Sequence, residues 1–441
     1  MDFVVVGEGE EVVGEIVDAY QTASAGIGPG GRSRRAFLDA LATVPGIYVP
    51  PKYEVGYASD GTVAAVVPKD GAPAVVTKRR LGDVNKFETI STLRTPHAEY
   101  GHMCLVEVGK GCGRGCRFCL EGQIYRPVRH RSLDALRQTA KKIADDGGSR
   151  VGLVGACVSD YPWIGDLLKA LAEHGMEVSV SSLRADSLTE ELVAALGESG
   201  HRTLTIAPET GTERLRKAIR KAITDEQLFA ACDLIREHGI PNLKCYFMIG
   251  LPGETMEDVA AIPDLASRLL SRLRVRDGDG RPFGKLTLSI SSYVPKPWTP
   301  FQWVAFDGVG SLEEKLEVIK RGVRRFPNVR VLHENPREAE LQALLARGDR
   351  RVADFLEIAA RLDGDWKRAL KEWAGDPAFY TCRRRALAEL MPWDHFDVGV
   401  KKAGLIREYY RAELGADSSG GPAGPWTQEP SPGHARAASV L

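Results

Sequence analysis

The sequence lacks any excess of charge of one sign, and it lacks long apolar runs. Its 441 residues contain 59 Lys plus Arg and 59 Asp plus Glu, so the formal net charge is zero. A chain with this balance has no overall field that attracts nucleic acid or an anionic membrane, although a local basic face is still compatible with it. No apolar run approaches the roughly 18–20 residues needed to cross a bilayer, so no transmembrane helix is expected.

A secretory signal and a disulfide framework are also missing. The N-terminus, MDFVVVGEGEE, carries acidic residues where a signal peptide carries basic ones. We therefore expect a cytoplasmic protein, in which cysteines stay reduced. Cysteine is scarce, and most of the singly scattered cysteines are expected to be small buried hydrophobic residues. These five are Cys104, Cys157, Cys232, Cys245 and Cys382.

The chain is long enough for two or three domains. Residues 1–95 predict a strand, an amphipathic helix and a β-rich connector, and residues 96–305 alternate apolar strands with amphipathic helices. Such alternation is typical of βαβ units, and right-handed crossovers curl about six of them into a partial (βα)6 barrel. Residues 306–414 read as mostly helical, and the Gly/Ser/Pro-rich residues 415–441 as a disordered tail. The predicted fold class is therefore α/β.

The remaining three cysteines stand together in the segment VEVGKGCGRGCRFCLEG. Cys112, Cys116 and Cys119 follow a CxxxCxxC spacing, and the glycines between them let the backbone bend around a compact cluster. Because only three thiolates converge, one iron of a four-iron, four-sulfur cluster would lack a protein ligand. Such an open position on a metal can be taken by a small molecule.

A zinc loop is the alternative interpretation of these cysteines. Structural zinc usually has four ligands in two pairs, and the sequence offers only Cys104 or His130 as a fourth. The glycine-rich loop and the βα pattern that follows favour the iron–sulfur interpretation. Arg114 and Arg117 either offset the thiolate charge or are simply solvated.

The CxxxCxxC motif, with Phe118 directly before its last cysteine and a strand before the loop, resembles the radical S-adenosylmethionine (radical SAM) superfamily. The resemblance implies that the open iron binds the amino and carboxylate groups of S-adenosylmethionine. It also implies that the reduced cluster cleaves this molecule to methionine and a 5′-deoxyadenosyl radical, which takes hydrogen from a substrate. An electron donor such as flavodoxin or ferredoxin is then required.

The resemblance extends to the ends of the second and third strands, where barrel enzymes place their sites. Gly155 and Ala156 match the position whose backbone meets the methionine amino group, which is also compatible with a tight turn. Ser182 and Arg184 end the third strand in SSLRAD, where the family places polar contacts to the cofactor.

The fourth and fifth strands carry the rest of the resemblance. Glu209 matches a ligand of the ribose hydroxyls, and Lys221 matches the cation that faces the methionine carboxylate. Without the cysteines both would be ordinary charges at a helix start and on a helix surface. Met248 and Gly250, in the string MIGLPGET, match the segment that lies against the adenine.

The strings DFVVVGEGEE, GCGRGCRFCLEG, APETG, YFMIGLPGET, VPKPWTPFQW and PWDHFDVGV together carry a narrower resemblance. It covers roughly residues 1–412 and concerns the branch of the superfamily with an N-terminal cobalamin-binding domain. That domain is a doubly wound sheet, and this sequence begins at what matches its last strand and helix. The motif DxHxxG, which supplies the lower ligand of cobalamin, does not occur. We expect a truncated half-sheet not to hold a corrinoid in the usual way, so cobalamin remains open, as does a shortened gene model. The branch implies methylation or rearrangement of an unknown substrate.

Residues near the C-terminal end of the barrel have two interpretations each. Trp298, Phe301 and Trp303 either line a substrate mouth or, as we favour, pack against the next domain. His395 is expected to be a satisfied structural histidine rather than a ligand. Cys382 is expected to be a buried free thiol rather than a hydrogen donor.

Two other functions remain open. The GLPGET string and the pattern of the fourth helix also resemble RNA- or ribosome-directed enzymes, namely methylthiotransferases and the Elongator-type subunit. The C-terminal helices are also Arg-rich, although such helices are commonly just solvated faces. Methylthiotransferases, however, carry a second three-cysteine site before the radical motif, and only Cys104 precedes Cys112 here. A non-catalytic iron–sulfur scaffold is the third hypothesis, against which the matching cofactor positions argue.

Overall fold

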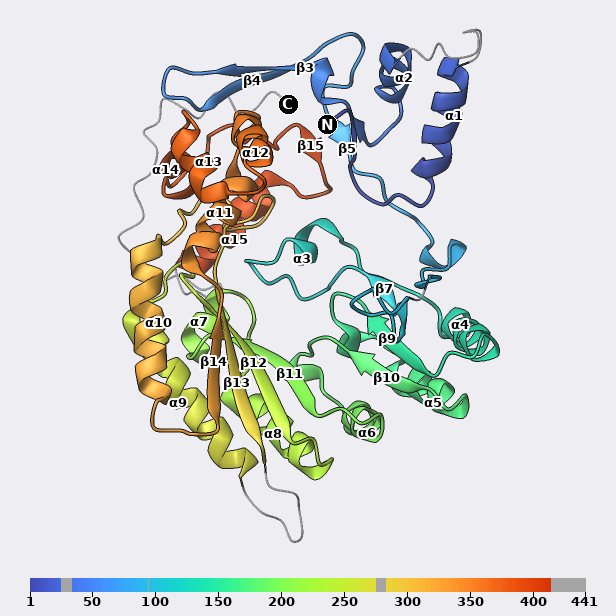
Figure 1. Ribbon diagram of the computed structural model, residues 1–441, viewed down its shortest axis with the longest axis vertical. Coiled ribbons are helices and arrows are strands. Elements are labelled where there is room, and N and C mark those ends of the chain that lie inside the picture. The colour runs from blue at the N-terminus through green and yellow to red at the C-terminus, as the bar shows by residue number, and fades with distance from the viewer. Residues whose placement is uncertain (25–33, 94, 275–282, 414–441) are drawn as a thin grey trace.

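The computed structural model describes residues 1–24, 34–93, 95–274 and 283–413. Its centre is an array of parallel strands with helices outside it (Figure 1). One sheet has the order β10-β9-β6 and the other the order β11-β12-β13-β14. A parallel bridge between Leu183 and Ile206 links the two sheets. The strands are β6 (Cys104–Glu107), β9 (Arg150–Val154), β10 (Glu177–Val180), β11 (Thr203–Glu209), β12 (Asn242–Ile249), β13 (Lys285–Ser292) and β14 (Val329–His333).

Every connection between successive parallel strands passes through at least one helix, which confirms the predicted partial βα barrel. The connecting helices are α4 (Leu133–Asp145), α5 (Ile164–Glu173), α6 (Glu190–Glu198), α7 (Glu213–Ala218), α8 (Asp225–Glu237), α9 (Met256–Leu273) and α10 (Val309–Val323). Strand β14 pairs with β13 and extends the sheet beyond residue 305, where the barrel was predicted to end. The division of the chain into domains remains a prediction.

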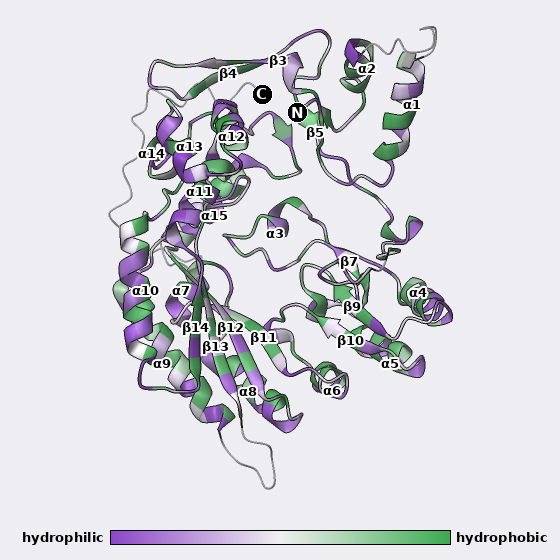
Figure 2. Cartoon of the chain, viewed as in Figure 1, coloured by the Kyte–Doolittle hydropathy of each residue, from purple (hydrophilic) through white to green (hydrophobic). Residues whose placement is uncertain are grey.

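Strand β12 illustrates how the sequence builds the barrel. Its residues alternate between buried and half-buried, as expected for a strand with two unlike faces. Phe247 and Ile249 belong to the main core with residues of the outer helices, whereas Met248 packs into a second apolar cluster. Helices α8 and α9, on either side of β12 in the chain, begin with capping boxes at Thr224 and Thr255. Figure 2 shows these outer helices with alternating apolar and polar patches.

The N-terminal region does not contain a doubly wound sheet within residues 1–24 and 34–93. Its first strand pairs antiparallel with the second, and the third and fourth form a hairpin within the predicted β-rich connector. The first helices pack with β1 and β2 around a small separate core. The elements are β1 (Val4–Val5), α1 (Val12–Ser24), α2 (Arg34–Leu41), β2 (Ile47–Tyr48), β3 (Tyr53–Tyr57), β4 (Val63–Pro68) and β5 (Val76–Thr77).

The C-terminal region is mostly helical, as predicted. It also contains β15 (Phe396–Asp397), which pairs in parallel with β5 and so connects the C-terminal region to the N-terminal region. The helices are α11 (Pro336–Arg347), α12 (Val352–Arg361), α13 (Trp366–Glu372), α14 (Pro377–Thr381) and α15 (Lys402–Glu413). Among the described residues, no helix has both the length and the apolar character needed to cross a membrane. The predicted tail of residues 415–441 lies outside the described residues.

Candidate active site

The three clustered cysteines lie on a loop at the carboxyl end of β6. The loop passes through β7 (Gly109–Lys110) and α3 (Glu121–Ile124) and returns through β8 (Arg129–His130), which pairs with β7. Gly111 and Gly115 have φ angles of 84° and 73°, a left-handed conformation that favours glycine. A Cβ atom on Gly111 would lie 2.0 Å from the carbonyl oxygen of Tyr125. The tight path of the loop therefore depends on glycine at this position.

Cys116 is the most enclosed of the three thiols. It is 8% exposed, whereas Cys112 and Cys119 are half-buried. Burial raises the pKa of both Cys116 and Cys119. The charges of Lys221 and Arg184 act in the opposite direction on the pKa of Cys116, because a nearby cation favours the thiolate.

Three predicted cofactor residues from separate parts of the barrel converge on Cys116. The Arg184 guanidinium Nη1 lies 3.9 Å from the Cys116 sulfur. Glu209 and Lys221 act electrostatically on the same thiol and form an ion pair with each other. Glu209 ends β11, and Lys221 follows α7. The structure therefore brings together residues that lie far apart in the sequence.

The ion pair between Glu209 and Lys221 is buried. The two residues are 8% and 6% exposed, respectively. Glu209 also has a φ of 70°, which is uncommon for a residue with a side chain. Such backbone conformations concentrate at functional sites. Its location at the carboxyl end of a barrel strand agrees with the usual position of a barrel active site.

A chain of ion pairs that the sequence did not reveal connects the cysteine loop to the ends of β9 and β10. Arg114 donates to Asp160 at 2.5 and 2.7 Å and to Asp186 at 3.2 Å. Arg184 donates to Asp186 through two bonds of 2.9 Å. Burial disfavours ionisation of Asp160, but Arg114 outweighs this effect and lowers the pKa of the carboxyl. Arg114 is thus held by two carboxylates, and its side chain is 35% exposed.

Arg117 also differs from the expectation of a solvated side chain or a thiolate partner. It is 7% exposed and donates to the carbonyl oxygen of Ala218 at 2.6 Å. Its guanidinium forms an ion pair of 3.1 Å with Glu408 on α15. Arg117 therefore fastens the cysteine loop to α7 and to the C-terminal helix.

The other predicted cofactor residues lie at the ends of their strands. Gly155 and Ala156 follow β9, and a Cβ atom on Gly155 would lie 3.1 Å from a methyl group of Val108. Ser182 follows β10 and is exposed. Gly250 has a φ of 81°, and its N–H donates to the Glu254 carboxylate at 2.7 Å.

Phe118 and Met248 pack against the same apolar cluster, as does Trp298. Phe301 and Trp303 are buried in that cluster, with exposures of 1% and 0%. Trp303 lies edge-to-face against Tyr409 of the C-terminal helix, with ring centroids 5.9 Å apart. The favoured interpretation, packing of Phe301 and Trp303 against the next part of the chain, is therefore correct.

Two expectations about single residues were wrong, those for Cys382 and His395. Cys382 is exposed rather than buried. Of the other scattered cysteines, Cys104, Cys232 and Cys245 are buried, as expected for most of them, and Cys157 is half-buried. The Cys112 thiol acts electrostatically on Cys157, and burial raises the pKa of Cys157 to about 11. His395 is not a satisfied histidine, because neither ring nitrogen has a hydrogen-bond partner within the described part of the chain. Burial lowers its pKa to about 4.

The donor set of the loop fits an iron–sulfur cluster. Within residues 1–24, 34–93, 95–274 and 283–413, no three His, Cys, Asp or Glu side chains form a ready-made site for a single metal ion. A cluster differs from such a site because its thiolates bind different irons and surround a larger core. Three thiols on one glycine-bent loop, with Arg184 and Lys221 beside the most buried of them, suit an anionic cluster of this kind.

Comparison with known families agrees with this geometry. Residues 106–266 match the family described as the radical SAM superfamily, and residues 1–50 match the family described as radical SAM proteins, N-terminal. The part of the chain that carries the three cysteines is thus similar to the radical SAM superfamily. The first match includes all three clustered cysteines and every cofactor position predicted from the resemblance.

Proteins similar to this chain include an uncharacterized protein of Methanocaldococcus jannaschii. The two are 37% identical over 261 residues, which cover 59% of this chain and 55% of the relative. The threonylcarbamoyladenosine tRNA methylthiotransferase of Treponema pallidum is 25% identical over 255 residues, covering 54% of this chain and 50% of that enzyme. The chain thus spans about half the length of these curated relatives.

Among solved structures, the radical SAM methyltransferase TsrM from Kitasatospora setae, with tryptophan and an S-adenosylmethionine analogue bound, matches with a TM-score of 0.42. The sequence identity is 17%, and the match covers 71% of this chain and 54% of that chain.

Proposed function

We propose that this chain is a radical SAM enzyme in which Cys112, Cys116 and Cys119 hold a four-iron, four-sulfur cluster. With S-adenosylmethionine, the cluster supplies reductive cleavage to methionine and a 5′-deoxyadenosyl radical, which takes hydrogen from a substrate. One observation carries the proposal: Cys116, on the glycine-bent loop, meets the charges of Arg184, Glu209 and Lys221. The substrate is not identified by any residue described above.

The residues around the loop have separate proposed roles toward S-adenosylmethionine. Lys221 would face the methionine carboxylate, and Glu209 the ribose hydroxyls. The backbone of Gly155 and Ala156, both half-buried, would meet the amino group, with Ser182 and Arg184 as polar neighbours. Phe118, Met248 and Gly250 would border the adenine; the shared apolar cluster of Phe118 and Met248 supports this role. The proposal also requires an electron donor such as flavodoxin or ferredoxin, and a cytoplasm that keeps the thiols reduced.

Cobalamin is not part of this proposal. The described residues before the barrel lack the doubly wound sheet that would hold a corrinoid, since β1 pairs antiparallel with β2. No step is therefore assigned to it.

The test is anaerobic reconstitution with iron and sulfide, reduction with dithionite and addition of S-adenosylmethionine. We expect 5′-deoxyadenosine to form in the wild type and not in a Cys116→Ala variant, while a Cys382→Ala control behaves as the wild type. An intact cluster without any 5′-deoxyadenosine would favour a non-catalytic scaffold and contradict the proposal.

RNA- or ribosome-directed modification is a second candidate for the substrate class. It is favoured by similarity to the tRNA methylthiotransferase of Treponema pallidum and to the ribosomal protein uS12 methylthiotransferase of Clostridioides difficile, the latter 23% identical over 181 residues. Salt-sensitive copurification of RNA with the full chain would support this candidate.

A further inference from the structure

A basic groove lies beside the cysteine loop. It has a volume of about 460 Å³ and lies between the loop around α3, the second residue after the end of α7, and α15 with the segment before it. Its lining includes five basic side chains and one acidic one, all from described residues. They are Arg126, Arg220, Lys401, Arg407, Arg411 and Glu408. This concentration of positive charge stands out in a chain whose formal net charge is zero.

The single carboxylate does not neutralise the groove. Glu408 pairs with Arg411 at 2.6 Å, with Arg117 at 3.1 Å and with Arg220 at 3.6 Å. Guanidinium groups therefore already surround it. Within the part of the chain that the structure describes, Arg126, Lys401 and Arg407 form no ion pair, and all three are exposed. Their charges remain available to an acidic partner.

The floor of the groove is continuous with the cysteine loop. Gln123 lines the groove and donates its side-chain N–H to the carbonyl oxygen of Cys116 at 3.2 Å. The N–H of Arg117, the next residue, donates to the carbonyl oxygen of Ile219 at 2.9 Å. A protein seated in the groove would thus be separated by one residue, Gln123, from the proposed cluster ligand Cys116.

Two adjacent residues separate the groove from the proposed cofactor pocket: Arg220 belongs to the groove and Lys221 to the pocket. Arg220 has a side chain that is 49% exposed and pairs with Glu408 in the groove. The next residue, Lys221, has a side chain that is 8% exposed and pairs with Glu209 beside Cys116. A substrate such as RNA must reach the pocket side, whereas an electron donor needs only to approach the loop. The position of the groove therefore favours an electron donor.

We propose that this groove is the docking surface for an acidic protein that delivers single electrons to the cluster. The inference rests on the proposed function, because reductive cleavage consumes one electron per S-adenosylmethionine. In the step itself, a reduced low-potential flavin or iron–sulfur protein loses one electron, and the oxidised cluster gains it. No bond forms or breaks, and no proton moves. Complementary charge speeds such transient docking and makes it sensitive to salt.

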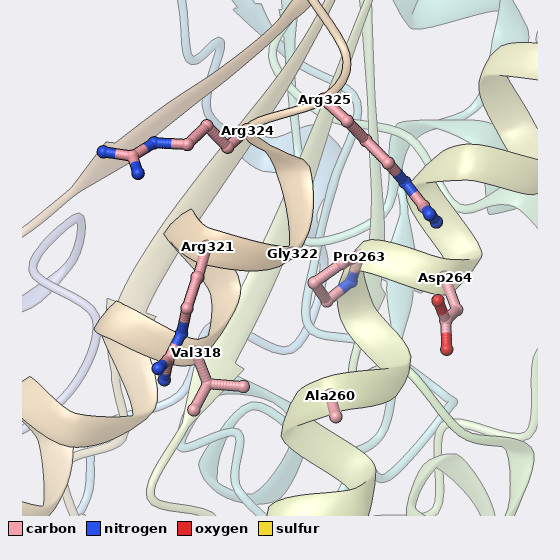
Figure 3. A pocket seen from close by; sticks show the side chains of 8 residues that line it. All are labelled: Ala260, Pro263, Asp264, Val318, Arg321, Gly322, Arg324 and Arg325. Atoms are coloured by element: carbon pink, nitrogen blue, oxygen red, sulfur yellow. The ribbon is translucent and has the colours of Figure 1, made fainter.

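A second Arg-rich groove provides a matched control. It lies between α9 and α10, and Arg321, Arg324 and Arg325 line it together with Asp264 (Figure 3). These helices lie on the outside of the barrel, away from α3 and the cysteine loop (Figure 1). Charge reversal there changes the net charge of the protein by the same amount without altering the surface over the loop.

The experiment measures 5′-deoxyadenosine formation by the reconstituted full chain with two reductants, dithionite and reduced flavodoxin. For the double variant Lys401→Glu/Arg407→Glu, we expect the flavodoxin-driven rate to fall about tenfold, because electrostatic steering typically changes association rates by this order. The dithionite-driven rate should not change. The control variant Arg324→Glu/Arg325→Glu should match the wild type with both reductants, and added salt should slow only the flavodoxin-driven reaction.

Three outcomes would overturn the inference. A flavodoxin-driven rate that is unchanged in the groove variant would do so while leaving the proposed function intact. The same holds if the variant loses bound RNA but not flavodoxin-driven activity, which would assign the groove to RNA. Absence of cleavage by the wild type with dithionite would instead remove the proposed function, and the inference with it.

Discussion

At the scale of single residues, the site is defined by charges buried beside a thiol. Glu209 and Lys221 are both nearly inaccessible, and each is the other's ion-pair partner. A buried charge without a partner is strongly destabilising, whereas the intact pair contributes little net stability. The pair is therefore better explained by a role at Cys116 than by a role in folding.

Replacing Lys221 by Met tests this role. The substitution leaves the Glu209 carboxylate buried without its partner and should destabilise the protein by about 3–5 kcal/mol. The double variant Glu209→Gln/Lys221→Met should recover most of this stability, yet bind S-adenosylmethionine at least about tenfold more weakly, a loss of about 1.4 kcal/mol. Denaturant unfolding and equilibrium dialysis measure the two effects. Wild-type affinity in the double variant would rule out a role in cofactor binding.

His395 makes a separate prediction about pH. Its ring contacts Tyr48, Tyr53 and Phe396, with centroid distances of 5.3, 5.8 and 4.0 Å. Burial, together with the charge of Arg350, lowers the pKa of His395 to about 4 from 6.5, while Asp394 acts in the opposite direction. Between these two values the unfolded chain binds the proton and the folded chain does not. The free energy of unfolding should therefore fall as the pH drops from about 6.5 to about 4, by at most about 1.4 kcal/mol per pH unit.

A His395→Phe variant should lose this component of the pH dependence. Replacement of the surface residue His174 by Gln serves as the control. It should leave the pH dependence of the free energy of unfolding unchanged. Denaturant unfolding at a series of pH values gives the comparison. An identical slope in wild type and His395→Phe would show that His395 is not responsible.

At the scale of elements, the cysteine loop is a glycine-dependent turn between β6 and α4. The thiols were predictable because their spacing and their glycines are local in the sequence. The chain of ion pairs from Arg114 through Asp160 and Asp186 to Arg184 was not predictable, since it forms only when three strand ends come together. The place of β14 in the barrel sheet was not predictable either, because the sequence of residues 306–414 indicated a mostly helical region.

Replacing Gly111 by Ala should impair the cluster without changing any thiol. Gly111 has a left-handed φ, and the added Cβ would meet the backbone oxygen of Tyr125. Substitution at such a position costs about 1–2 kcal/mol even before the contact is counted. We expect lower iron content after reconstitution. Gly113→Ala is the matched control, because its Cβ would meet only a methyl group of Val128 at 3.7 Å. Equal iron content in the two variants would contradict the account.

At the scale of the whole molecule, the N-terminal region is tied to the barrel by a buried ion pair. Arg129, on β8, donates to Glu8 at 2.5 and 2.8 Å, and the side chains are 8% and 3% exposed. Glu8 also accepts from the backbone N–H of Leu81 at 2.7 Å. The Glu8 carboxylate thus connects the N-terminal segment with Leu81 of the β-rich connector and with Arg129 at the end of the cysteine loop. The sequence predicted these three segments but could not reveal that they meet.

Removing this connection should loosen the N-terminal region. Arg129→Met leaves Glu8 buried without its partner, so the free energy of unfolding should fall by about 3–5 kcal/mol. The exposed pair of Lys86 and Glu11 is the control, and Lys86→Met should cost no more than about 1 kcal/mol. Denaturant unfolding and limited proteolysis of residues 1–50 distinguish the two. Equal stability of both variants would show that the buried ion pair of Arg129 and Glu8 does not hold the N-terminal region to the barrel.

The central claim is that Cys112, Cys116 and Cys119 hold an iron–sulfur cluster with one iron open to S-adenosylmethionine. The most direct measurement is electron paramagnetic resonance of the reconstituted, reduced wild type, recorded with and without S-adenosylmethionine beside an iron and sulfide assay. We predict about four irons per chain and a signal that changes when S-adenosylmethionine is added. Bound zinc in place of iron, or a cluster signal that S-adenosylmethionine leaves unchanged, would contradict the claim.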